Sequence, residues 1–124
     1  MALARLTGGT REAAQPPEPY YRRTSRGLRD MPVDVNEPRN WDLSNEYTGN
    51  QAFDLFNIGP VLGLDWILIN NTTDAIAVTV DDDQTYTIQS NQMGGRRNTK
   101  FIRLVIVPVD AVAEYSLHIT GIKP

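Results

Sequence analysis

The sequence contains no cysteine and a single histidine, His118. Disulfide bonds, thiolate nucleophiles and zinc sites with cysteine ligands are therefore excluded. One histidine cannot form a metal centre without several carboxylate partners, and alternation along its strand places it on an outward face. The sequence predicts no metal site, and the stability of the chain has to come from apolar packing or from partners.

Motifs for catalysis are also missing. No Gly-x-Ser-x-Gly elbow surrounds any serine, and the run Gly94-Gly95-Arg96-Arg97 lacks the Gly-Lys-Ser/Thr end of a phosphate-binding loop. The acidic run Asp81-Asp82-Asp83 lacks the spacing of a calcium-binding EF-hand and is typical of a solvated turn. We therefore expect no catalytic residue, no cofactor and no enzymatic activity.

Long hydrophobic runs are absent as well. No stretch approaches the roughly 20 apolar residues that span a bilayer. The apolar start, residues 1–6, is interrupted too soon for a secretory signal. The sequence therefore predicts a protein made and used in a cytoplasm, without a membrane partner.

What the sequence does contain is an uneven distribution of charge. Residues 1–40 hold seven arginines and five acidic residues, a net charge of +2, whereas residues 41–124 hold five basic and ten acidic residues, a net charge of −5. Complementary charge favours encounter between molecules and fixes their register. A basic segment joined to an acidic body could therefore dock on an acidic neighbour, including another copy of the chain.

Residues 1–40 are predicted to form an extended arm. Five of the eight prolines lie there, and each removes a backbone donor and disfavours helix before it. Such a segment buries too little apolar surface to offset an ordering entropy of roughly 1–2 kcal/mol per residue. We expect the arm to be ordered by partners and residues 41–124 to form the folded body.

Within the arm, three prolines precede a compact set of anchor residues. A polyproline II segment followed by aromatic and guanidinium groups is well suited to docking on a surface, because its unbound entropy is already low. A plain linker remains the alternative. The predicted partner-binding residues are Tyr20, Tyr21, Arg22, Arg23 and Trp41 in or next to the arm, with Arg96 and Arg97 in the body.

The body reads as a series of short strands. Residues 75–80, 85–90 and 113–120 alternate apolar and polar side chains, which is the period of a half-buried strand. Residues 52–58, 65–70 and 101–107 are further candidates, and 91–99 is the longest loop. No amphipathic helix separates them. The predicted fold is all-β, a small antiparallel β-sandwich or jelly-roll-like barrel preceded by the arm.

Three segments of the body resemble small β-sandwich proteins of tailed double-stranded DNA phage virions. They are Trp66–Asp81, Phe101–Val105 and Tyr115–Gly121, within roughly the last sixty residues. The resemblance implies a capsid decoration (cement) or minor capsid protein, or a neck or tail component. It transfers no functional residue, because such families carry no catalytic signature.

The expected function is therefore structural: a virion protein, assembled in a host cytoplasm, that docks its body on the shell and straps neighbours with its arm. Expected partners are the major capsid protein or other virion proteins, and further copies of the chain, with a trimer favoured. Nucleic acid is not an expected partner, because acids interrupt the arm's arginines. A neck, tail or spike component is the first alternative, and a carbohydrate- or ligand-binding β-sandwich is the alternative from another class.

Overall fold

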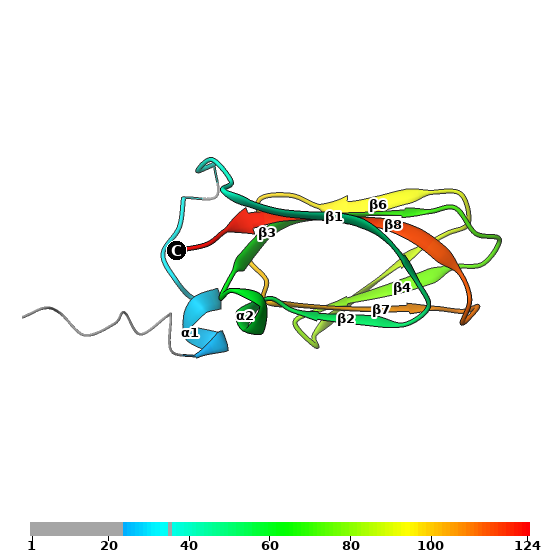
Figure 1. Ribbon diagram of the computed structural model, residues 1–124, viewed down its shortest axis with the longest axis horizontal. Helices are drawn as coiled ribbons and strands as arrows, with labels where there is room; N and C mark the ends of the chain where they lie inside the picture. The colour runs from blue at the N-terminus through cyan, green and yellow to red at the C-terminus, as the bar shows by residue number, and fades with distance from the viewer. Residues whose placement is uncertain (1–23, 35) are drawn as a thin grey trace, which may run out of the picture.

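Two antiparallel four-stranded sheets face each other in the computed structural model, which describes residues 24–34 and 36–124 (Figure 1). The strand orders are β1-β8-β3-β6 and β2-β7-β4-β5. The first sheet is made of β1 (Trp41–Thr48), β8 (Glu114–Ile122), β3 (Leu62–Asn70) and β6 (Met93–Arg96), and the second of β2 (Gln51–Asp54), β7 (Arg103–Pro108), β4 (Ile76–Val80) and β5 (Gln84–Ile88). The predicted all-β sandwich is confirmed.

The pairing describes one long hairpin rolled into two sheets. Strand β4 pairs with β5, β3 with β6, β2 with β7 and β1 with β8, all antiparallel. Two further pairs, β3 with β8 and β4 with β7, join these ribbons side by side. This arrangement of eight strands in two sheets is a jelly roll.

The main core lies between the sheets and follows the period of two. Trp66 and Leu68 of β3 point inward together with Tyr115 and Leu117 of β8, and all four are buried. Ile76 and Val78 of β4 face them from the other sheet. The inward faces predicted for residues 75–80 and 113–120 are confirmed, because a strand with one buried face places alternate side chains in the core.

A second apolar cluster closes one end of the sandwich. Two short helices lie at that end beside the C-terminus, α1 (Ser25–Arg29) and α2 (Leu55–Ile58) (Figure 1). The Thr24 hydroxyl caps α1 by accepting a hydrogen bond from the Gly27 amide at 2.9 Å. The buried members of the cluster are Leu28, Met31, Leu62, Leu64 and Ile122.

A register shift in β3 connects the two clusters. Gly63 pairs with Gly121, but Asp65 pairs with Thr120, so β3 holds one more residue than β8 at this point. Ile119, which pairs with Trp66, belongs to the main core, whereas Ile122, which pairs with Leu62, belongs to the second cluster. The same bulge leaves Asp65 on the outer side of the sheet.

Three local predictions were wrong in their details. The strand expected over residues 52–58 ends at Asp54, and α2 follows it. Residues 41–48, not among the strand candidates, form β1, in which the polar Asn45 interrupts the alternation of Trp41, Leu43 and Tyr47. Part of the predicted loop 91–99 forms β6, because Gly95 allows close approach to the β3 backbone.

The structure describes only part of the predicted arm. Residues 1–23 and 35 lie outside the described residues. Residues 24–34 and 36–40 lie against the body: Leu28 is fully buried, Met31 is nearly so, and α1 is helical where an extended chain was expected. Across the described residues, no helix has the length and apolarity to cross a membrane.

At the opposite end, Tyr115 holds the turn between β1 and β2. Gly49 adopts a φ of 72°, which suits glycine, and its carbonyl accepts a buried hydrogen bond from the Tyr115 hydroxyl at 2.8 Å. Burial, with a smaller effect of nearby Tyr47, raises the pKa of Tyr115 to about 12. The phenol therefore remains protonated in the folded chain well above its ordinary pKa of 10.0.

Replacing Tyr115 by phenylalanine should lower the free energy of unfolding by about 1–3 kcal/mol, because the buried Gly49 carbonyl loses its partner. Urea unfolding at neutral pH measures the loss. The matched control is Tyr86→Phe, whose hydroxyl has no hydrogen-bond partner among the described residues. Since the folded pKa of Tyr115 is raised, its stabilising effect should persist below pH 10.0 and fade as the pH rises toward 12. Equal losses in the two variants would contradict the assignment.

Candidate partner-binding site

The structure separates the predicted anchor Trp41 from the predicted body anchors. Trp41 begins β1, half-buried against the main core, whereas Arg96 and Arg97 lie at the end of β6. β1 and β6 are the two opposite edges of one sheet, with β8 and β3 between them. Trp41 therefore does not share a surface with the two arginines.

The predicted arm anchors Tyr20, Tyr21, Arg22 and Arg23 lie outside the described residues. Their nearest described neighbour is Thr24, the N-cap of α1. The prediction that they bind a partner therefore stays a prediction.

Arg96 and Arg97 belong to opposite faces of the sheet, as successive residues of a strand do. Arg96 pairs across the strands with inward-facing Trp66, and its guanidinium lies over the Tyr86 ring, 4.8 Å from the centroid. Arg97 lines a hollow on the outer face with Asp65 and Thr120. Both arginines also line a hollow beside Met93, so they share that surface and differ in their second contact.

The outer face around β6 combines apolar and basic groups. Met93 is 67% exposed, and together with Ile67 and Arg97 it lines a hollow of about 230 Å³. Gly94 and Gly95 present only backbone there. Methionine and arginine are enriched where proteins bind proteins, so this hollow is a candidate contact surface.

A second exposed apolar surface lies at the tip of the β7–β8 loop. Val109 is 75% exposed and Val112 is 72% exposed, and Val107 at the end of β7 is also exposed. The loop precedes β8, whereas the second cluster contains Ile122 at the end of that strand. A strand of this length spans roughly 30 Å, so the valines and the helices occupy opposite ends of the molecule.

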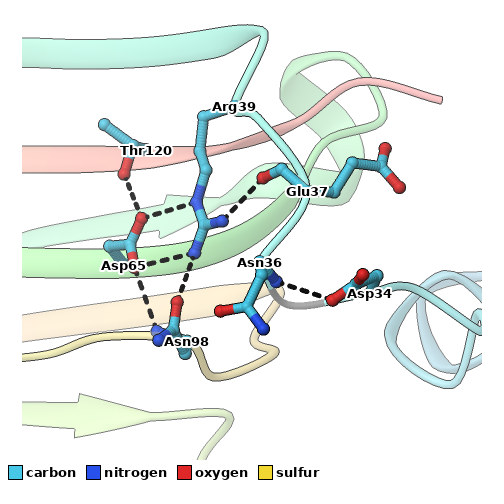
Figure 2. Close-up of polar contacts among 7 residues, drawn as sticks. All are labelled: Asp34, Asn36, Glu37, Arg39, Asp65, Asn98 and Thr120. Carbon is cyan, nitrogen blue, oxygen red and sulfur yellow. Dashed lines mark hydrogen bonds and ion pairs between the residues drawn. The ribbon is translucent and has the colours of Figure 1, made fainter.

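The connection from the helical end into β1 is held by an ion pair between Arg39 and Asp65 (Figure 2). Nε of Arg39 lies 2.9 Å from Oδ2 of Asp65, and one terminal nitrogen lies 3.1 Å from Oδ1. The two side chains are only 19% and 20% exposed. This bidentate geometry is the strong form of the arginine–carboxylate interaction.

Asp65 gathers two further donors. The Thr120 hydroxyl donates to Oδ2 at 2.6 Å, and the Asn98 amide donates to Oδ1 at 3.0 Å (Figure 2). Burial alone would raise the pKa of Asp65, but the hydrogen bonds from Arg39, Thr120 and Asn98 outweigh it and hold the pKa below its ordinary value of 3.8. We call Arg39, Asp65, Asn98 and Thr120 the Asp65 network.

No pattern in the sequence predicts this network. Arg39 and Asp65 are 26 positions apart, and Thr120 is a further 55 from Asp65. Only the bulge in β3 and the pairing with β8 bring them together. In isolation, Asp65 stands out only as a charged residue within an otherwise apolar run.

Metal binding has no support in the part of the chain that the structure describes. No set of three or more histidine, aspartate or glutamate side chains is placed to hold a metal ion. His118 lies on the exposed face of β8, where its Nδ1 is 2.8 Å from the Ser44 hydroxyl. No family model, curated protein or solved structure matches the chain.

Replacing Arg39 by alanine or Asp65 by asparagine should lower the free energy of unfolding by about 1.5–3 kcal/mol, because each change removes charge-assisted hydrogen bonds from a half-buried site. Chemical denaturation measures it. The control is Arg103→Ala, which removes the exposed pair with Asp82 and should cost no more than about 1 kcal/mol. A loss no larger than this control would contradict the network's role.

The lowered pKa of Asp65 determines how the free energy of unfolding should change with pH. Since the folded pKa of Asp65 is lowered, its stabilising effect is complete above the unfolded value of 3.8 and is lost as the pH falls through the folded value. The stability difference between the unmodified chain and Asp65→Asn should therefore be constant near neutral pH and shrink below pH 3.8. A difference that persists in strong acid would contradict this assignment.

Proposed function

We propose that this chain is a non-enzymatic structural protein of a virion, a capsid decoration or cement protein that docks its jelly roll on the shell and straps neighbouring subunits with residues 1–23. The observation that supports the proposal is that the residues following this segment are attached to the body at a defined place. Leu28 and Met31 are buried in the body, and the Asp65 network holds Arg39, so the chain preceding Thr24 starts from a defined point.

A tether with a fixed origin binds as a second module. Once the body docks, the attached segment meets its own site at high effective concentration, and the two contacts together slow dissociation. Fully extended, residues 1–23 reach roughly 75 Å. This reach exceeds the roughly 30 Å length of β8, so the segment is long enough to cross a neighbouring subunit.

The composition of the segment suits such a role. Residues 1–23 hold four arginines and two acidic residues, a net charge of +2, with three prolines before Tyr20 and Tyr21. The exposed Val109 and Val112 offer the body a separate apolar contact at the other end. The two attachment points would thus lie on opposite sides of the docked molecule.

The fold gives support by analogy only. Jelly rolls are common among viral capsid domains, but also among lectins and cupins, and a fold hosts many functions. The carbohydrate-binding alternative needs an aromatic platform on the surface. Trp66 and Tyr115 are each only 1% exposed, so these two rings belong to the core rather than to such a platform.

Copies of the chain are proposed to associate, with a trimer favoured, because a cement protein often sits at a threefold position of a shell. The hollow formed by Met93, Ile67 and Arg97 is the proposed contact between copies. A closed ring of this kind uses two different surface patches on each subunit.

The proposal predicts binding of the full chain to undecorated shells assembled from the shell protein encoded in the same genome. Co-sedimentation at increasing concentration should saturate at a fixed ratio of chain to shell subunits. Joint replacement of Tyr20, Tyr21, Arg22 and Arg23 by serine should weaken binding by about 100-fold or more, because the second contact of the tether is lost.

The matched control replaces Arg5 and Arg11 by serine, which removes the same two arginine charges outside the proposed anchor set. This variant should bind within about tenfold of the unmodified chain, as expected when only long-range charge is changed. Failure of the full chain to sediment with shells, or equal weakening in both variants, would contradict the proposal.

A further inference from the structure

A cavity of about 170 Å³ opens between the free edges of the two sheets. β6 is the edge of one sheet and β5 the edge of the other, and the cavity lies where they come together. Trp66, Tyr86 and Arg96 line it from β3, β5 and β6, and Arg29 and Lys100 line it from α1 and the β6–β7 loop. It is separate from the outer hollow at Met93.

Trp66 is the most buried residue of this lining. Its side chain is only 1% exposed, and its indole Nε1 is the one buried side-chain nitrogen or oxygen in the described residues without a hydrogen-bond partner. A buried donor left unpaired costs about 1–3 kcal/mol. Such groups are rare in folded proteins, and each one requires an explanation, for example an acceptor supplied by a water, an ion or a ligand.

The charges around the cavity favour an anion. Arg96 and Lys100 form no ion pair in the described part of the chain, although Lys100 donates to the Met31 carbonyl at 2.6 Å. Arg29 is 3.9 Å from Asp81, whose other oxygen already accepts the amides of Ile102 and Arg103. Arg29 is also 3.6 Å from Asp30, so its charge is already paired. Of the lining groups without an ion pair in the described residues, Arg96 and Lys100 are cations and the exposed Asp83 is an anion, which leaves a surplus of one positive charge.

We propose that this cavity binds a planar carboxylate, which accepts the Trp66 indole N–H and pairs with Arg96 and Lys100. A single surplus charge matches a monoanion, whereas a doubly charged phosphate would be repelled by Asp81 and Asp83. A cavity of about 150 Å³ holds a benzene ring, so this volume admits a ligand of similar size. The inference does not depend on the proposed function.

In the proposed complex, Arg96 is the residue that moves. Less than 1 Å² of Nε1 is exposed, so a ligand reaches it only after a covering side chain turns aside. Arg96 pairs directly across from Trp66 on an edge strand, is exposed, and is held there by its contact with the Tyr86 ring. A cation–π contact at an exposed site is weak, and a charge-assisted pair with a carboxylate is stronger. In the proposed complex, Arg96 therefore exchanges its contact with the Tyr86 ring for a pair with the carboxylate.

The test follows the indole N–H resonances of the full-length ¹⁵N-labelled chain. Only two exist, from Trp41 and Trp66, and Trp41→Phe assigns them. Sodium benzoate is the probe for a free carboxylate, and N-acetylglutamate amide is the probe for an acidic side chain of a partner. Benzamide and sodium chloride are the neutral and ionic-strength controls. The Trp66 resonance should shift saturably with a carboxylate probe and with neither control.

Arg96→Gln should weaken that binding about tenfold or more, because a charge-assisted pair is lost. The control Arg97→Gln changes the adjacent arginine on the other face and should leave the affinity unchanged. The tighter of the two probes identifies the source of the carboxylate. The proposal would be overturned if the Trp66 N–H exchanged with water and its resonance shifted with neither carboxylate probe. An equal shift with benzamide would also overturn it. So would equal losses of affinity in Arg96→Gln and Arg97→Gln.

Discussion

The position of Asp65 governs how the ends of this chain are joined. A bulge in β3 turns its carboxylate to the outer face, where it meets Arg39 from the N-terminal connection, Thr120 from β8 and the Asn98 amide from the β6–β7 loop. Three segments far apart in the sequence are thereby fixed to one side chain. Removing that acceptor would leave a half-buried guanidinium without its principal anion, which is why the network acts as a unit.

The Asp65 network affects both the proposed strap and the proposed carboxylate cavity. Because Arg39 is fixed, Leu28 and Met31 can remain in the second apolar cluster, and the segment before Thr24 departs from the helical end. Because the loop at Asn98 is fixed, Lys100 is held beside the cavity that Trp66 and Arg96 line. The valines of the β7–β8 loop lie at the far end of β8, so the proposed docking contact is distant from the proposed origin of the strap.

Alternation predicted the parts of the fold that depend on local pattern. The strands near residues 75–80 and 113–120 could be read directly, because one buried face imposes a period of two. β6 could not, since Met93-Gly94-Gly95-Arg96 has no apolar alternation and pairs only because β3 offers it an edge. α2 was missed because four residues between strands carry no helical period.

The candidate sites were less predictable than the strands. Arg96 and Arg97 were singled out as neighbouring basic residues, but only the structure shows that Arg96 contacts Tyr86 while Arg97 lines the hollow at Asp65. Trp66 lies in the core, and the lack of an acceptor for its N–H depends on packing between β5 and β6 that no local pattern encodes. The Asp65 network depends on the register between β3 and β8, which are far apart in the sequence. Short stretches of sequence do not predict that register.

The most direct test of the central claim is cryo-electron microscopy of particles produced from the genome that encodes this chain, from which the density at each chain position is measured. The account predicts jelly-roll density on the shell surface, with the β7–β8 valines and the hollow beside β6 in contacts and residues 1–23 running from Thr24 onto a neighbouring subunit. Particles that lack the chain, or that carry it with residues 1–23 folded only against their own body, would contradict it.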